Sequence, residues 1–116
     1  MALTSYYLGR PVDLRMRKAG EKWNIAMEHT AQLFKPTDFQ RFDCVFAVTD
    51  EAADLLKDLA SSEEDLKKIV LATAFSSKFK DKDIPDPYYD GPGAFDHVME
   101  MAIDCCEGIL EHLIQV

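Results

Sequence analysis

Apolar residues gather in two short runs and one longer periodic segment. The first run, Phe42–Thr49, is apolar and rich in β-branched residues, which is typical of a buried parallel strand. Thr49 or Asp50 is then expected to cap a helix that continues to about Ala60. A second run with strand composition, Lys68–Phe75, follows a polar stretch. A strand, a helix and a second strand in this order predict an α/β fold.

The C-terminal segment has the spacing of a long amphipathic helix. Its apolar residues recur at steps of three or four, and acidic residues stand between them. The apolar positions are Phe95, Val98, Met99, Ala102, Cys106, Ile109, Leu110 and Leu113. We expect this helix to pack on the sheet.

Three shorter segments complete the predicted elements. Arg15–Asn24 is charged with few apolar positions, and it predicts a short exposed helix. Pro36 suits the opening of a single helical turn that ends near Arg41, because the first turn needs no N–H donor there. The polar residues 61–67 predict a solvated connection with a capping serine. Since no repeat or flexible linker interrupts the chain, residues 1–116 are expected to form a single domain.

Net charge limits the partners of the protein. The chain has 21 acidic and 13 basic residues, which give a formal net charge of −8. This charge disfavours nucleic acid and anionic membranes, and no basic stripe counters it. The start of the sequence has no signal-peptide pattern, and the longest apolar run, Ile69–Phe75, is too short to span a bilayer. We therefore expect a cytoplasmic protein that binds neither nucleic acid nor membrane.

The cysteine pattern indicates reduced thiols. The chain has three cysteines, and two of them, Cys105 and Cys106, are adjacent. This arrangement is no disulfide framework, and no Cys/His spacing suggests zinc, so neither a metal nor a cofactor is expected. Cys44 falls in a predicted strand and Cys106 on an apolar helix stripe. We expect both to be inert core thiols, and Cys105 to be similar.

A loop rich in proline and glycine holds the most informative motif, Asp86-Pro87-Tyr88-Tyr89. Together with matches along nearly the whole chain, it resembles the low molecular weight protein tyrosine phosphatase family. The other matching positions are Tyr6, Gly9, Pro11, Asp13, Arg15, His29, Ala31, Asp38-Phe39, Phe42-Asp43, Asp50-Glu51, Ile84-Pro85, Gly91, Phe95, Cys105 and Leu110. The resemblance implies a flavodoxin-like parallel sheet.

The resemblance also implies roles for five residues. Asp86 stands at the position of the general acid that protonates the leaving phenolate oxygen. Tyr6, Tyr88 and Tyr89 would line the substrate cleft, and His29 would support the phosphate-binding loop. Ordinary structural roles are the alternative for each of these residues. Asp86 is a common turn residue before proline, and the paired tyrosines suit any half-buried loop. A lone histidine is more often structural than functional.

The chemistry of this family depends on a Cys-x5-Arg loop, in which backbone N–H groups cradle phosphate and arginine makes a forked contact with its oxygens. The sixth residue after each cysteine is Asp50, Glu111 or His112, so no cysteine opens such a loop. Met1–Thr4 already matches the end of the second family strand, and we expect an incomplete fold without the first strand, loop and helix.

Two functions follow from this expectation. One is a catalytically inactive phosphatase-like protein, in which Asp86 is vestigial. The other is a truncated or split phosphatase that hydrolyses phosphotyrosine proteins through a cysteinyl-phosphate intermediate when the loop is supplied. The missing strand would leave a gap in the sheet beside Phe42–Thr49, so we expect a homo-oligomer or a partner chain that covers it.

Overall fold

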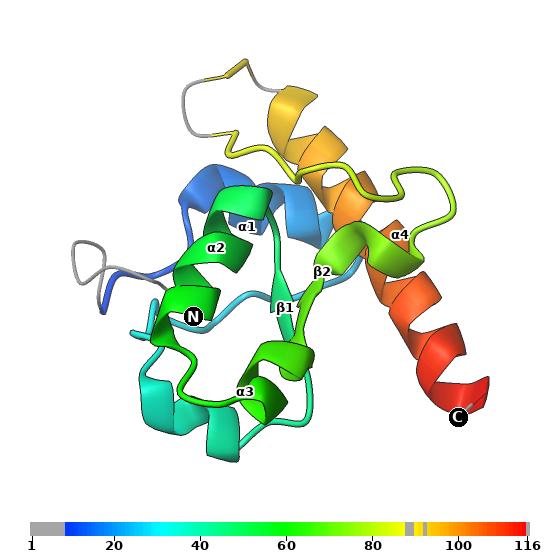
Figure 1. The fold of residues 1–116 in the computed structure, drawn as a ribbon. Coiled ribbons are helices and arrows are strands. Elements are labelled where there is room, and N and C mark those ends of the chain that lie inside the picture. Colours follow the sequence, from blue (N-terminus) through cyan, green and yellow to red (C-terminus); the bar gives the residue numbers. More distant parts are fainter. Residues whose placement is uncertain (1–8, 88–89, 92, 116) are drawn as a thin grey trace. The chain divides into compact units, whose positions relative to one another are not determined.

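The computed structural model describes residues 9–87, 90–91 and 93–115, and these divide into two compact units (Figure 1). Unit 1 comprises Met1–Phe34 and Asp86–Glu100, and unit 2 comprises Lys35–Pro85 and Met101–Val116. The prediction of a single domain over 1–116 stays a prediction. The helix α4, Gly93–Gln115, begins in unit 1 and ends in unit 2.

Unit 2 contains a small parallel sheet. Its strands β1 (Val45–Ala47) and β2 (Ile69–Leu71) pair in parallel, with Val45 opposite Ile69 and Ala47 opposite Leu71. The helix α2, Asp50–Leu59, packs on both strands (Figure 1). Its N-cap is Thr49, whose side chain accepts a hydrogen bond from the Ala52 N–H at 3.0 Å. The predicted α/β order and the predicted cap are confirmed.

Both strands are shorter than the apolar runs that predicted them. After Leu71 the chain turns into the 3-10 helix η2, Ala72–Phe75, instead of continuing the strand. Thr73 holds this turn, because its buried hydroxyl donates to the Lys82 carbonyl at 2.6 Å. This bond to a residue nine positions later stabilises η2 at the end of the strand.

The polar stretch at 61–67 was wrongly predicted to be a connection, since most of it forms the helix α3, Glu63–Lys68. Ser62 caps this helix by accepting from the Asp65 N–H at 3.1 Å, as expected of a capping serine. The Asp65 carboxylate accepts from Ser61 N–H in return, at 3.2 Å. Acidic residues in the first turn and lysines in the last also suit the helix dipole.

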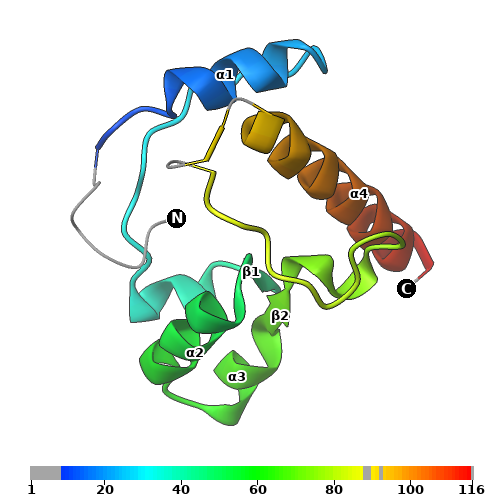
Figure 2. The ribbon, with the colours of Figure 1, turned by 90° about the horizontal axis from the view of Figure 1, so that it is seen from above.

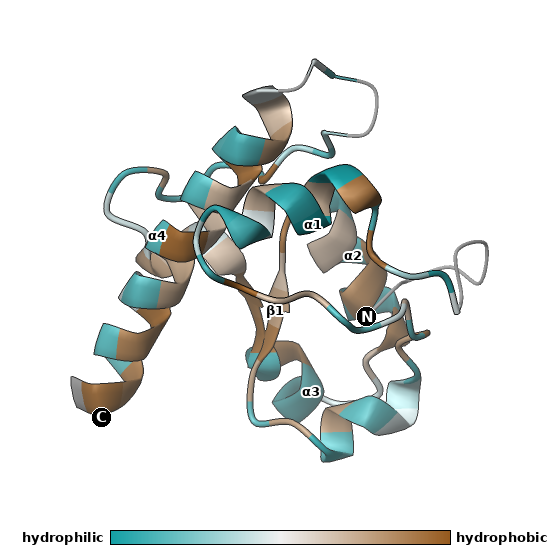
Figure 3. Cartoon of the chain, turned by 180° about the vertical axis from the view of Figure 1, so that it is seen from behind, coloured by the Kyte–Doolittle hydropathy of each residue, from teal (hydrophilic) through white to brown (hydrophobic). Residues whose placement is uncertain are grey.

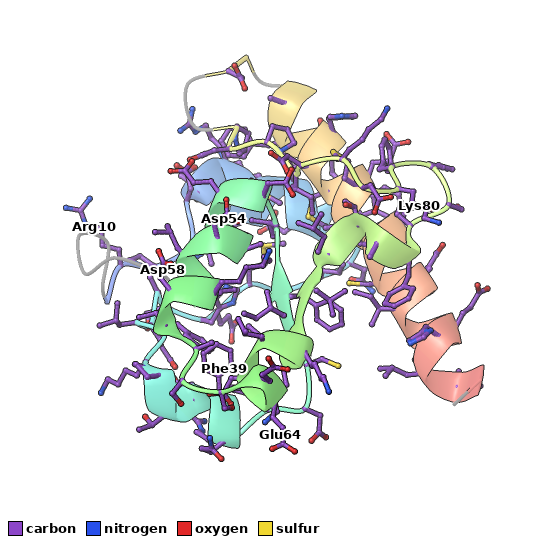
Figure 4. All side chains as sticks on the ribbon, viewed as in Figure 1. Arg10, Phe39, Asp54, Asp58, Glu64 and Lys80 are labelled. Atoms are coloured by element: carbon purple, nitrogen blue, oxygen red, sulfur yellow. The ribbon has the colours of Figure 1, made fainter. Side chains whose placement is uncertain are left out.

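The turn predicted at Pro36 is confirmed as the 3-10 helix η1, Pro36–Gln40. Its buried Asp38 accepts from the Lys35 N–H at 2.8 Å, and this bond lowers the pKa of the Asp38 carboxyl. Phe39 follows and is completely buried in the core of unit 2, below α2 in Figure 4. The Lys68 ammonium donates to the Phe39 carbonyl at 2.5 Å.

The long amphipathic helix is confirmed, and Figure 3 shows the alternation of apolar and polar residues along α4. Its burial differs from the prediction at the C-terminal end, where Leu110 and Leu113 are 58% and 55% exposed. Cys106 is exposed as well, and so is Cys44, which precedes β1. The prediction that these two cysteines are core thiols is wrong. Cys105 alone is buried, and burial raises the pKa of its thiol.

A buried carboxylate ties the middle of α4 to the loop after η2. Asp104 accepts hydrogen bonds from the Ser76 hydroxyl, the Ser77 N–H and hydroxyl at 3.1 Å, and the Lys78 N–H at 3.2 Å. The bond from Ser76 contributes most to lowering the pKa of the Asp104 carboxyl. The carboxylate therefore fixes both the serine pair and the start of the following loop.

Unit 1 is built on the helix α1, Leu14–Glu21, which lies beside the first turns of α4 (Figure 2). Asp13 caps α1 by accepting from the Arg15 N–H at 2.8 Å. The Arg15 guanidinium lies over the Phe95 ring, 4.6 Å from its centroid, and Lys22 pairs with Asp96 at 2.9 Å. The helix predicted over Arg15–Asn24 therefore starts one residue earlier and ends three residues sooner.

No helix within the described ranges is long and apolar enough to cross a membrane.

Candidate functional site

Asp86, the predicted general acid, is the first residue of the second segment of unit 1, and it is exposed. Just beyond it the Asp90 N–H donates to the Pro87 carbonyl at 3.0 Å. Tyr6, Tyr88 and Tyr89, the predicted cleft residues, lie outside the described residues. The catalytic role of Asp86 and the cleft roles of these tyrosines stay predictions.

His29, the predicted loop support, is exposed and lines a hollow of about 430 Å³ in unit 1. The other lining residues, which with His29 define the His29 hollow, are Arg10, Pro11, Val12, Thr30, Ala31 and Gln32. Asp86 is not among them. The structure thus places His29 in the same unit as Asp86, but only His29 lines the hollow.

Two extended segments form the wall of the His29 hollow. Gly9 donates its N–H to the Ala31 carbonyl, and Ala31 donates its N–H to the Arg10 carbonyl, each at 2.9 Å. An antiparallel bridge joins Pro11 to Thr30. These reciprocal bonds fix the backbone, so the side chains around the hollow project from a rigid frame.

The sequence prediction missed most of this hollow. It singled out His29 through the family resemblance and noted nothing at Thr30. The helix α1 lies between Arg10 and His29 in the sequence, and no periodic pattern predicts that segments so far apart pair in a short antiparallel bridge. The hollow could have been predicted only if the pairing of residues 9–12 with 29–32 had been known beforehand.

No cysteine stands where an activated nucleophile is expected. A low thiol pKa requires a helix N-terminus or a cationic neighbour. Cys105 is in the opposite setting, because burial and the neighbouring Asp104 carboxylate both raise the pKa of its thiol. Cys106 lies in the interior of α4, and Cys44 precedes β1. Across the described residues no group of three or more His, Cys, Asp or Glu residues could hold a metal ion.

Comparison with known proteins extends these observations. The family model for low molecular weight phosphotyrosine protein phosphatase matches residues 3–115. A putative low molecular weight protein-tyrosine-phosphatase of Synechocystis sp. is 31% identical over 111 residues, which cover 95% of this chain and 70% of the relative. The low molecular weight phosphotyrosine protein phosphatase of Gallus gallus is 33% identical with the same coverage.

A solved structure supports the fold independently. The crystal structure of a protein tyrosine phosphatase from Entamoeba histolytica with Hepes in the active site matches with a TM-score of 0.91 at 29% identity. The match covers 97% of this chain and 72% of that structure. The predicted α/β fold of this family is confirmed, whereas the absence of its first strand, loop and helix stays a prediction.

Proposed function

The chain belongs to the low molecular weight phosphotyrosine protein phosphatase family, and we propose that in its 116-residue form it is a member without catalytic activity. Three observations support the proposal. The sequence has no Cys-x5-Arg motif, burial raises the pKa of the Cys105 thiol, and Asp86 can protonate a leaving group only after a nucleophile has attacked.

The missing motif carries the most weight. In acyl or phosphoryl transfer through cysteine, the thiolate forms the covalent bond, and removing the nucleophile removes the two-step route altogether. A retained acid contributes only to the departure of the leaving group. The family resemblance of Asp86 therefore concerns ancestry, and the proposed present role of the chain is binding.

We expect the purified chain to hydrolyse p-nitrophenyl phosphate no faster than a blank, since no thiolate is positioned to attack phosphorus. Steady-state release of p-nitrophenolate measures this. Asp86→Ala and the control Asp90→Ala, which removes another exposed aspartate of unit 1, should leave the background unchanged. Turnover that is lost in Asp86→Ala and kept in Asp90→Ala would refute the proposal.

The second candidate is a split or truncated phosphatase, and the near-complete family match over residues 3–115 favours it. Here another polypeptide supplies the Cys-x5-Arg loop, and the pair hydrolyses phosphotyrosine proteins through a cysteinyl-phosphate. Co-expression with a family strand–loop–helix segment tests it. Vanadate-sensitive activity that appears only in the mixture, and disappears with Asp86→Ala, would support this candidate over the first.

We further propose that the chain assembles with copies of itself. Within the described residues β1 pairs only with β2, and we propose that its other edge pairs with a second copy. Val48, the residue after β1, is 49% exposed, and the strand carries no lysine or proline that would discourage pairing. Apolar Leu110 and Leu113 are exposed on the same unit. A second copy would cover such surfaces, and a different partner chain is the alternative.

We expect light scattering coupled to gel filtration to give at least twice the monomer mass at micromolar concentration. Val48→Lys places a charge directly after β1, beside the proposed contact, and should shift the population toward monomer. Leu66→Lys, at a 43% exposed position on α3, is the matched control and should not. A compact wild-type monomer, or an equal effect of both variants, would contradict assembly through β1.

We also propose a cytoplasmic location. All three cysteines are unpaired, as in proteins of reducing compartments. Imaging a fluorescent fusion in cells tests this, and secretion of the fusion would refute it.

A further inference from the structure

The His29 hollow is lined by groups that can donate hydrogen bonds. Arg10 contributes a guanidinium, His29 a ring N–H, Thr30 a hydroxyl and Gln32 an amide. The described residues that line the hollow include no aspartate or glutamate, although acidic residues outnumber basic ones by 21 to 13 in the chain. Such a lining favours an anion over a cation or a neutral molecule.

The charge of the lining selects the kind of anion. Arg10 is the one permanent cation among the described residues that line the hollow. A guanidinium has five N–H donors, so it can serve a protein partner and a ligand together. One cation matches a monoanion, and a planar carboxylate fits its forked geometry. A phosphate dianion would need a second cation or a cradle of backbone N–H groups, and the net charge of −8 would oppose it further.

The remaining lining supplies an apolar surface for the rest of the ligand. Pro11, Val12 and Ala31 lie in the same wall as the donors. Ligand sites commonly combine a few convergent polar groups with apolar walls. The volume of about 430 Å³ also falls within the usual range for small-molecule sites.

From these features we infer that the His29 hollow binds small organic carboxylates, that is, a carboxylate attached to an apolar body. This inference goes beyond the proposed function, because it needs neither a nucleophile nor assembly. The Gly9–Ala31 and Ala31–Arg10 hydrogen bonds hold the site in place before binding, which reduces the entropy lost on binding.

Benzoate is a suitable probe, with benzamide as its neutral counterpart of equal shape. In a ¹H–¹⁵N NMR titration of the full chain, we expect benzoate to shift the Thr30 and Gln32 amide signals in a saturable manner. Benzamide should shift them little, and phenylphosphonate should bind more weakly than benzoate. Equal responses to benzoate and benzamide would overturn the inference, and tighter binding of phenylphosphonate would overturn the preference for a monoanion.

Two substitutions of the same charge test the location. Gln32→Glu places a carboxylate in the exposed lining, and its repulsion should weaken benzoate binding about tenfold. Gln40→Glu adds the same charge at an exposed position of η1 and should leave the affinity within about twofold. If both variants bind alike, the hollow is not the site. The amide spectrum of each variant shows separately whether the variant is folded. Neither result of the benzoate titration bears on the p-nitrophenyl phosphate assay, so the two proposals are tested independently.

Discussion

Replacing Gly108 by alanine is expected to destabilise the protein by about 3 kcal/mol or more, although alanine favours helices over glycine by about 1 kcal/mol. Gly108 lies in α4, where the helix meets η2. A Cβ built there would be 1.9 Å from the Phe75 carbonyl oxygen and 2.6 Å from its carbonyl carbon. Both are backbone atoms, so no rotamer change can relieve the overlap.

The packing around Gly108 leaves little room for adjustment. One turn later, the His112 ring stacks on the Phe75 ring, with centroids 4.0 Å apart and an interplanar angle of 16°. Moving α4 outward to admit a methyl group would separate the His112 and Phe75 rings. It would also disturb the hydrogen bonds that Asp104, on α4, accepts from Ser76 and Ser77. We therefore expect the cost of overpacking to exceed the gain in helix propensity.

Urea denaturation followed by circular dichroism measures the effect. Gly93→Ala in the same helix is the matched control, since a Cβ at Gly93 has no atom within 4 Å. The control should be neutral or slightly stabilising. A Gly108→Ala protein as stable as the control would mean that α4 and η2 do not approach each other so closely in solution.

The elements that the sequence predicted correctly carry their information locally. Thr49 before an amphipathic run marks the start of α2, and Pro36 marks η1, because a cap and a first-turn proline act on adjacent residues. The prediction of a connection in place of α3 failed although a local cap was present. Ser62 followed by Asp65 was a readable cap, but the stretch has Leu66 as its one apolar residue and so shows no amphipathic pattern.

The errors arise where distant residues decide the outcome. The strand predicted to Phe75 ends at Leu71, and the following η2 contains Thr73, which bonds to Lys82, nine residues away. Cys106 falls on the apolar stripe of α4, yet it is exposed, as are Leu110 and Leu113. Asp104 resembled any polar helix position. Its burial depends on the hydroxyl of Ser76, and no local pattern couples the two.

The catalytic interpretation came almost entirely from the family resemblance. Asp86 and His29 are ordinary residues by composition, and only the match with family order attached roles to them. The structure adds the surroundings of His29, which the resemblance did not supply. The absence of a Cys-x5-Arg motif, in contrast, was visible in the sequence itself.

The stability of the protein is expected to depend on pH through Asp104. Hydrogen bonds from Ser76, Ser77 and Lys78 lower the pKa of this carboxyl below its ordinary value of 3.8. A carboxyl with a lowered pKa in the folded state stabilises the fold at all pH values above its unfolded pKa. The contribution is lost as the pH falls below about 4 and through the folded pKa.

Asp104→Asn should therefore lower the melting temperature between pH 5 and 7, because the amide cannot accept all four hydrogen bonds that the carboxylate accepts. The difference from the wild type should be constant over that range and shrink as the pH falls below about 4. Asp54→Asn, on the exposed face of α2, removes the same charge and should change little. Calorimetry from pH 3 to 7 on the three proteins decides the matter: a difference between Asp104→Asn and the wild type that persists undiminished at pH 3 would show that the variant acts through packing and not through the ionised carboxylate.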